Sequence, residues 1–278
     1  MKKLLFALGC ALLALNAWGL TRTLRSPHIA EARSNPADLR ISHEQLLSQI
    51  ARRPNEADRA YIHRLTFALS DGIAHYWGDD VDRFHLRVPV WENYLLYAAS
   101  FVWPAAYRKY EFAGVDRAIE RGVGLCSQQS IVLARLLQRE GIDAQLQGLQ
   151  GHVVVRTRDA SGTTYLADPD YRVVIPYDAA TVERRPEIVR PYYEAAGLDR
   201  RLTDSLVSIY GPDGNREWTI GQYFYGKFHH AERAAYLLKW LIPLLLALPY
   251  LFSLRAARGA AIVHRNVAPG PSQAWWGR

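Results

Sequence analysis

The sequence predicts an α+β domain between two apolar segments, and three observations indicate this fold class. Apolar residues recur at helical spacing through the first half of the chain. Runs of β-branched residues separated by a turn follow in the second half and are typical of antiparallel strands. An apolar run also lies near each end of the chain, beside basic residues. Helices that precede a sheet in this way suit an α+β arrangement.

The N-terminal apolar run covers residues 1–20. Lys2 and Lys3 precede its apolar residues, as in a secretory signal peptide or in a signal anchor that is not cleaved. Both alternatives stay open, because Ala17-Trp18-Gly19 is a poor cleavage site. Residues 21–40 are polar and contain two prolines, so we expect a linker beside the membrane.

The domain between the apolar runs, residues 41–230, begins with helices. Ser42 has capping-box spacing and starts a short helix, and Pro54 starts a longer one. We expect Trp91–Val102 to form an aromatic-rich helix that a following proline interrupts. This helix is too short to span a bilayer, so we expect it in the core. Val115–Glu120 predicts a final turn or short helix.

Cys126 stands where a glycine-rich turn runs into a helix. Apolar residues at helical spacing predict this helix over Ser127–Glu140, and Gly141 ends it. The first N–H groups of a helix and the positive end of its dipole favour a thiolate, which is the nucleophilic form of cysteine. The only other cysteine, Cys10, lies in the N-terminal apolar run. A reactive thiol and a small buried hydrophobic residue are both compatible with this position.

A β-hairpin is predicted after this helix. Residues 152–156 and 163–167 form its strands, and the turn residues 159–162 join them. A further strand or sheet edge is predicted over residues 173–176, where a proline ends it.

The hairpin brings an acid near His152. In a hairpin centred on the turn, the residue that faces His152 lies within about one position of Pro169. A register shift of one puts Asp168 or Asp170 across from the imidazole. A carboxylate there would orient the imidazole, which would then deprotonate Cys126 and later protonate a leaving group.

The C-terminal part continues with a helical stretch over residues 187–201 and an irregular segment over residues 204–222. Residues 234–254 are apolar enough for a transmembrane helix, with an interfacial or domain-buried helix as the alternative. Residues 255–278 form a basic tail that carries four arginines and no acidic residue.

The net charge of +7 is concentrated beside the two apolar runs. This distribution indicates membrane topology rather than nucleic-acid binding, and no nucleic-acid recognition motif accompanies it. If both runs span, their basic flanks face the cytoplasm and the domain faces the periplasm or the outside. The predicted location is therefore the cell inner membrane.

Four motifs around Cys126 occur in an order that is found in a known family. They are Gly124-Leu125-Cys126, Gly141-Ile142-Asp143-Ala144, Gly151-His152-Val153-Val154 and Tyr165-Leu166-Ala167-Asp168-Pro169. Over about Val115–Tyr177 the chain resembles the transglutaminase-like superfamily of cysteine enzymes. The resemblance implies a papain-like core, in which a helix with the cysteine packs on an antiparallel sheet. It also implies that Cys126, His152 and Asp168 occupy the family's three catalytic positions.

The segment between the cysteine and the histidine is short for this family, so the long loops that shape the substrate cleft of larger relatives are missing. Relatives use an aromatic or glutamine side chain to assist the oxyanion. Trp103, Tyr107 and Tyr110 precede Cys126 and are candidates, with core or rim aromatics as the alternative interpretation. The backbone N–H of Cys126 is a further donor.

The resemblance implies a membrane-anchored cysteine hydrolase or acyltransferase that forms an acyl-enzyme on an amide or ester. Water would make it a peptidase or amidase, and an amine would make it a transamidase. The topology suggests an envelope substrate: a peptide, a cell-wall component or a surface polymer. The competing interpretation is a non-catalytic binding module in an envelope or surface-polymer assembly complex.

No metal or organic cofactor is implied by the sequence, which lacks an HExxH motif and a paired CxxC motif. We expect the scattered histidines His63, His75 and His85 to be exposed or to cap helices. The oligomeric state stays open.

Overall fold

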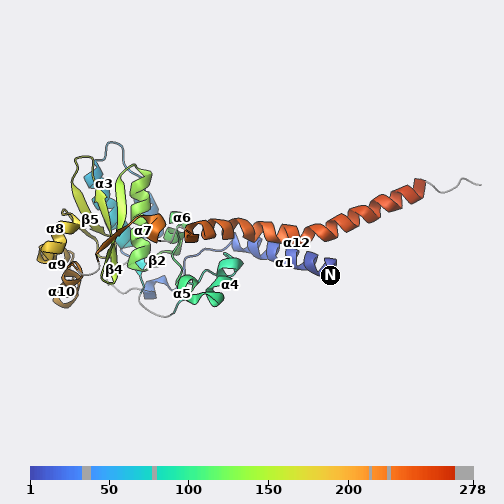
Figure 1. Cartoon of the computed structure of the whole chain (residues 1–278), viewed down its shortest axis with the longest axis horizontal. Helices are drawn as coiled ribbons and strands as arrows, with labels where there is room; N and C mark the ends of the chain where they lie inside the picture. The colour runs from blue at the N-terminus through green and yellow to red at the C-terminus, as the bar shows by residue number, and fades with distance from the viewer. Residues whose placement is uncertain (33–38, 77–79, 213–214, 224–226, 267–278) are drawn as a thin grey trace, which may run out of the picture. The chain divides into compact units, whose positions relative to one another are not determined.

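A computed structural model describes residues 1–32, 39–76, 80–212, 215–223 and 227–266 (Figure 1). The chain forms two compact units. One comprises residues 1–21 and 236–278, and the other comprises residues 22–235. The end of the predicted basic tail, residues 267–278, lies outside the described residues.

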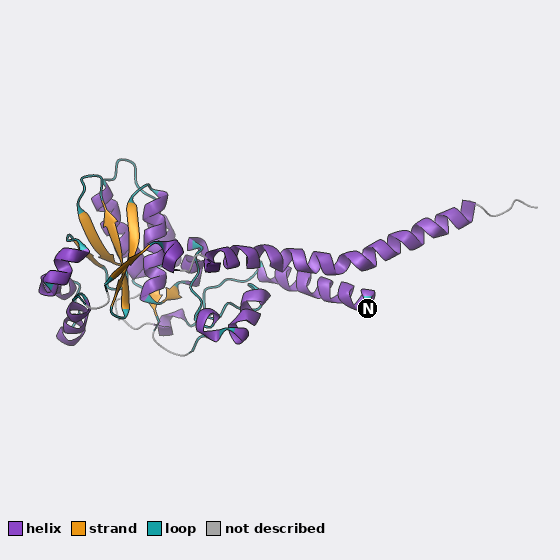
Figure 2. Cartoon of the chain, viewed as in Figure 1, coloured by secondary structure: helices purple, strands orange, loops and turns teal. Residues whose placement is uncertain are grey.

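The larger unit is α+β with an antiparallel sheet, which confirms the predicted class at this level (Figure 2). Its elements are η1 (Ile29–Ala32), α2 (His43–Ile50), α3 (Asp58–Gly72), β1 (Ala74–His75), α4 (Tyr94–Val102), α5 (Pro104–Tyr107), α6 (Val115–Arg121), β2 (Val123–Gly124), α7 (Cys126–Arg139), β3 (Asp143–Leu149), β4 (His152–Arg158), β5 (Thr164–Asp168), β6 (Val173–Ile175), α8 (Ala179–Arg184), η2 (Pro186–Val189), α9 (Arg190–Ala195), α10 (Arg200–Ile209), β7 (Arg216–Trp218) and α11 (Ile220–Tyr223). Two helices, α1 (Lys2–Gly19) and α12 (Lys227–Asn266), complete the described chain.

The main sheet has the strand order β6-β5-β4-β3-β7, and all of its neighbouring strands are antiparallel. Helix α7 packs against β3 and β4, and α3 packs against α7, β5 and β6. The predicted hairpin is β4 and β5, and the predicted strand at residues 173–176 is the edge strand β6. The start of α7 is therefore held on the strands that follow it in sequence.

The prediction of an irregular segment over residues 204–222 is wrong. Helix α10 continues to Ile209, and β7 adds an edge strand to β3. The helical stretch predicted over residues 187–201 is divided, because Gly197 adopts a left-handed φ of 86° after α9. Strand β7 has three residues and no buried alternation, so the sequence pattern gave no strand signal.

The expected burial of the Trp91–Val102 helix is also wrong. Helix α4 begins at Tyr94, where the Asn93 side chain accepts from the N–H groups of the next turn. Only Leu96 and Ser100 of this helix are buried. The end of α4 and the start of α5 leave large apolar side chains exposed.

Part of the segment expected to be a linker belongs to the larger unit. Leu24 is fully buried, and its N–H donates to the Glu120 carboxylate over 2.9 Å. The Ser26 hydroxyl donates to the Arg83 carbonyl over 2.6 Å. Residues 33–38 of the expected linker lie outside the described residues.

The smaller unit contains α1 and most of α12, and both helices are long and apolar enough to cross a membrane. The candidate spans are Lys2–Gly19 and His230–Arg255, which contain most of the predicted segments 1–20 and 234–254. The ring centroids of Phe6 and Tyr250 are 4.9 Å apart, so the two helices lie in contact within this unit.

A hydrogen bond from α1 replaces one that α12 lacks. Pro243 has no N–H, so it cannot close the helical hydrogen bond to the carbonyl of Lys239. The Asn16 side-chain Nδ2 donates to that carbonyl over 2.6 Å. Gly9 permits the close approach, because a Cβ at this position would lie 2.6 Å from the Pro243 carbonyl oxygen. In lipid no water is present to supply the missing donor.

We expect Asn16→Leu to lower the free energy of unfolding by about 1–3 kcal/mol, because it leaves the Lys239 carbonyl without this donor. Unfolding of the full chain in detergent micelles measures the effect. Ser253→Ala is the matched control, because Ser253 donates to the Tyr250 carbonyl within α12 itself. Equal losses for the two variants would contradict the role assigned to Asn16.

Candidate active site

Cys126 is the first residue of α7, which begins one residue earlier than predicted. Gly122 ends α6 in the left-handed region, with a φ of 67°. Strand β2 then pairs in parallel with β1 and places Gly124 beside His75. A Cβ on Gly124 would lie 2.7 Å from the Cβ of Gln128, so glycine is needed for this tight entry into the helix.

Buried polar groups fasten the start of α7. The Gln128 side chain accepts from the Phe112 N–H over 2.7 Å and donates to the Phe112 carbonyl over 2.9 Å. Arg121, which is 1% exposed, donates to Gln128 over 2.9 Å and to the Val123 carbonyl over 3.0 Å. It also donates to the Tyr110 carbonyl over 2.5 Å. The side chains of Arg121 and Gln128 thus hold the backbone on both sides of Cys126 in place.

Glu232, near the beginning of α12, fastens the segment that leads to α6. Its carboxylate accepts from the N–H groups of Ala113 over 2.9 Å and Gly114 over 3.2 Å, and from the Tyr110 hydroxyl over 3.0 Å. Burial, followed by the Glu232 charge, raises the pKa of Tyr110, so the phenol stays protonated and donates.

His152 and Asp168 meet through the hairpin. His152 Nε2 donates to Asp168 Oδ2 over 2.8 Å. The β4–β5 register pairs Val155 with Ala167, and its continuation puts Asp170, not Asp168, opposite His152. Asp168 is two residues from Asp170, and side chains two residues apart share one face of a strand. The Asp168 side chain therefore lies on the same face as His152, diagonally across from it. Asp168 is therefore the residue that holds His152.

The Asp168 carboxylate is fully buried and accepts four hydrogen bonds. Oδ2 accepts from His152 and, over 2.9 Å, from the Tyr193 hydroxyl. Oδ1 accepts from the backbone N–H groups of Asp170 over 3.0 Å and Tyr171 over 3.4 Å. The hydroxyls of Tyr193 and Tyr210 are 2.7 Å apart. Burial, followed by the Asp168 charge, raises the pKa of Tyr193, so it remains a donor.

Cys126 completes the group, because its side chain is near enough to His152 to influence the imidazole pKa. Burial alone would lower the pKa of His152, but Asp168 and Cys126 together raise it well above its ordinary value.

The structure brings the three predicted residues together from three separate elements. Cys126 comes from α7, His152 from β4 and Asp168 from the end of β5. Cys126 is 8% exposed and His152 is 5% exposed. The site is thus close to the surface but open to solvent only over a small area.

A second buried pair lies beside the first, and the expectation of an exposed or capping His75 is wrong. His75 Nδ1 is hydrogen bonded to Asp170, and both side chains are almost fully buried. Gln129, one helical turn after Cys126, donates to the Asp170 carboxylate and to the Ile73 carbonyl, each over 3.4 Å. This pair joins β1 and α7 to the turn after β5, beside the elements α7 and β5 that carry Cys126 and Asp168.

The three candidate oxyanion aromatics form a row of ring contacts. The centroids of Trp103 and Tyr107 are 6.1 Å apart, and those of Tyr107 and Tyr110 are 5.9 Å apart. Tyr110 donates its hydroxyl to Glu232, so it is not directed to Cys126. Trp103 is exposed at the α4–α5 junction. These positions favour the backbone N–H groups at the start of α7 as oxyanion donors.

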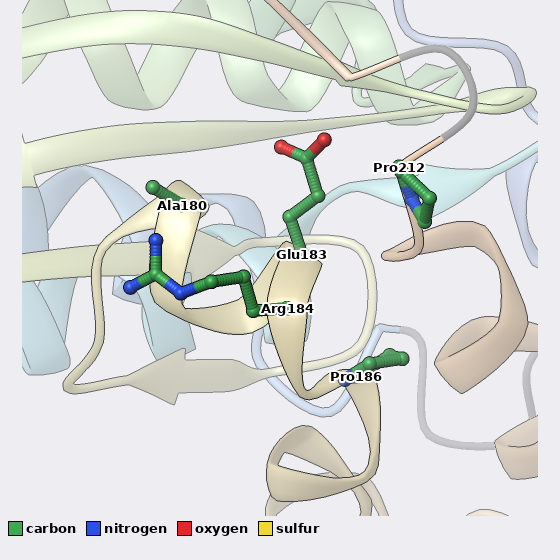
Figure 3. Close-up of a pocket in the computed structure, with 5 residues that line it drawn as sticks. All are labelled: Ala180, Glu183, Arg184, Pro186 and Pro212. Atoms are coloured by element: carbon green, nitrogen blue, oxygen red, sulfur yellow. The ribbon is translucent and has the colours of Figure 1, made fainter.

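A separate pocket lies at α8. Figure 3 shows Glu183 and Arg184 of this helix beside it. Ala180, Pro186 and Pro212 complete its lining, which includes no nucleophile among the described residues. In the described parts of the chain, no group of three His, Cys, Asp or Glu side chains is placed to hold a metal ion.

We expect Asp168→Asn to lower the pKa of His152, because burial then acts against a weaker attraction. Histidine-selective NMR titration of the full chain measures this. A raised pKa stabilises the fold below the ordinary histidine value, and that stabilisation is lost as the pH rises through the folded-state pKa. The free energy of unfolding of the Asp168→Asn chain should therefore fall less than that of the unaltered chain as the pH rises through this range.

Asp170→Asn is the matched control, because Asp170 bonds to His75 rather than to His152. It should leave the His152 titration close to that of the unaltered chain. The same His152 pKa in the Asp168→Asn chain would contradict the pairing.

Comparison with protein-family models, curated proteins and solved structures gives no match for this chain.

Proposed function

We propose that this protein is a membrane-anchored thiol enzyme with a transglutaminase-like, papain-like core. The observation that carries the proposal is the grouping of Cys126, His152 and Asp168, in which His152 is hydrogen bonded to Asp168 and Cys126 raises the pKa of His152 from the first position of a helix. A helix that bears the cysteine and an antiparallel sheet that bears the other two residues support the papain-like assignment.

Each residue has a defined role in the proposed reaction. The Cys126 thiolate attacks the carbonyl carbon of an amide or ester and forms a carbon–sulfur bond. The negative charge on the carbonyl oxygen is stabilised by N–H groups at the start of α7. When the carbon–nitrogen or carbon–oxygen bond breaks, the His152 imidazolium gives its proton to the leaving group. Asp168 holds His152 in orientation throughout.

The acyl-enzyme is resolved by a second nucleophile. His152, now neutral, takes a proton from water or from an amine, which attacks the thioester and releases Cys126. Water makes the protein a peptidase or amidase, and an amine makes it a transamidase. The proposed substrate class is an envelope peptide, a cell-wall component or a surface polymer.

A non-catalytic binding module is the second candidate function. The small exposed fractions of Cys126 and His152 favour it, because a catalytic thiol must be reached by a substrate. In this alternative the buried polar group serves to hold the fold, and the domain binds a partner in an envelope assembly complex. Thiol reactivity separates the two candidates.

The proposed location is the inner membrane, with α1 kept as an uncleaved anchor and the domain in the periplasm. Lys2 and Lys3 before α1, and Arg255 and Arg258 after the second candidate span, support this orientation. The hydrogen bond from Asn16 to α12 supports retention of α1, since cleavage would remove a donor from a membrane helix.

We expect iodoacetamide to modify Cys126 quickly at pH 7, and His152→Ala to slow it about tenfold or more. An ordinary thiol is only a few per cent thiolate at this pH, whereas a thiolate paired with an imidazolium is ready to react. Timed mass spectrometry in a Cys10→Ser background measures the rate, since Cys10 is the only other cysteine.

His63→Ala is the matched control, because this partly buried histidine packs against Tyr165 instead. It should leave the rate nearly unchanged. A Cys126 that reacts no faster than free cysteine, with no effect of His152→Ala, would favour the binding module.

We also expect alkaline phosphatase to be active when fused after Tyr210 and inactive when fused after Asn266. The enzyme matures only outside the cytoplasm, and the basic residues that follow the second candidate span should hold that end inside. Phosphatase activity in intact cells measures both fusions. The reverse pattern would refute the proposed orientation.

A further inference from the structure

The larger unit presents an unusual apolar apex at the junction of α4 and α5. Phe101, Val102 and Trp103 are consecutive and are 59%, 87% and 55% exposed. Among the described residues of this unit, no other large hydrophobic side chain exceeds 49% exposure, the value for Leu47. Isolated exposed apolar residues are normal, but three in succession at one apex indicate a surface that contacts another apolar phase.

The apex is built into the fold. Leu96 and Ser100 of α4 are buried and attach the helix to the domain. Arg87 donates to the Ser100 hydroxyl over 2.8 Å, and its guanidinium lies 4.2 Å from the centroid of the Phe101 ring. Trp103 leaves the helical conformation, with a φ of −135°, and Pro104 starts α5. The side chains are therefore presented at a fixed turn between two helices.

The charges near the apex are those of a membrane interface. Arg108 and Lys109 follow α5 and are exposed. Asp82 and Glu92 have cationic partners, since Arg87 pairs with Asp82 over 2.8 Å and Arg117 pairs with Glu92 over 3.4 Å. Tryptophan and phenylalanine beside lysine and arginine are typical of surfaces that enter the headgroup region of a bilayer.

The chain itself keeps this domain near lipid. The domain follows α1 directly, and it precedes the second candidate span. Because a candidate span adjoins each end of the domain, a lipid bilayer is the apolar surroundings that the α4–α5 junction would contact.

We propose that the α4–α5 apex, Phe101–Trp103, inserts into the lipid headgroup region, with Arg108 and Lys109 facing lipid phosphates. The expected depth is about 5–10 Å, as for interfacial amphipathic segments. The apex is then a third membrane contact of the protein, in addition to α1 and α12.

The segment after the apex runs to the candidate site. Glu111 accepts from the Ser127 hydroxyl, and Phe112 is held by two hydrogen bonds to Gln128. Ser127 and Gln128 are the two residues that follow Cys126. Insertion of the apex would thus fix the thiol near the lipid surface, and the substrate would be an amide or ester carried by a membrane-attached molecule. This consequence for the substrate rests on the proposed function, whereas the insertion does not.

The test uses the full chain with Cys10→Ser, Cys126→Ser and Val102→Cys, labelled with an NBD fluorophore. The protein is reconstituted in vesicles of phosphatidylcholine and phosphatidylglycerol. We expect a blue shift of the emission, loss of quenching by aqueous iodide and quenching by lipids brominated on the acyl chains. Leu47→Cys in the same background is the control, because Leu47 is exposed on α2. Its label should remain open to iodide.

A measurement with both cysteines intact complements the labelling. Brominated lipids should quench less of the total tryptophan emission in the Trp103→Phe chain than in the unaltered chain. Equal iodide access at positions 102 and 47, together with no effect of Trp103→Phe, would overturn the proposal. Protection of position 102 in native membranes but not in lipid vesicles would also overturn it and would indicate a protein partner.

The result is independent of thiol chemistry, because the labelled chains lack Cys126. Lipid protection at position 102 with an unreactive Cys126 in the native sequence would leave the membrane contact standing and remove the proposed enzyme.

Discussion

The buried carboxylate of Asp168 is the constraint on which the candidate site depends. A carboxylate that is buried away from water needs hydrogen-bond donors. The donors to Asp168 are the His152 imidazole, the Tyr193 phenol and two backbone N–H groups. These donors come from β4, α9 and the turn after β5, so the need to satisfy one acid fixes the relative positions of three segments. The same contact occupies Nε2 of His152. The electrostatic balance of the site and the local fold are therefore set by the same hydrogen bonds.

The cysteine is positioned in a different way, through the backbone around it. Gly122 and Gly124 allow a tight entry to α7, and Arg121 and Gln128 fix the neighbouring carbonyl and N–H groups. The second buried pair, His75 and Asp170, braces the same region from β1. Rigid packing around the site is useful for either candidate function, because it holds the thiol and the imidazole in fixed positions without rearrangement. Rigidity alone does not separate an enzyme from a binding module.

Local patterns predicted what depends on local structure. The α7 helix with Cys126 at its start, the β4–β5 hairpin and the β6 edge follow from periodicity and turn residues, and these elements are present. The choice between Asp168 and Asp170 does not follow from the register alone, because the β4–β5 pairing puts Asp170 opposite His152, whereas the diagonal Asp168 accepts its hydrogen bond. Tyr193 and the His75–Asp170 pair depend on contacts between distant segments, which periodicity does not encode. Strand β7 is too short to give a sequence signal, and the exposed end of α4 shows that apolar composition alone does not indicate burial.

The contact between Asn16 and Lys239 has a consequence for biosynthesis. The amide donor is translated 223 residues before the carbonyl that it serves. During that interval the whole catalytic candidate domain must be made, and the polar side chain of α1 has to be accommodated without its eventual acceptor. Until α12 is made, the Asn16 side chain lacks this acceptor, so the two helices complete each other only when both are present. Pairing of α1 with α12 therefore follows synthesis of the domain between them.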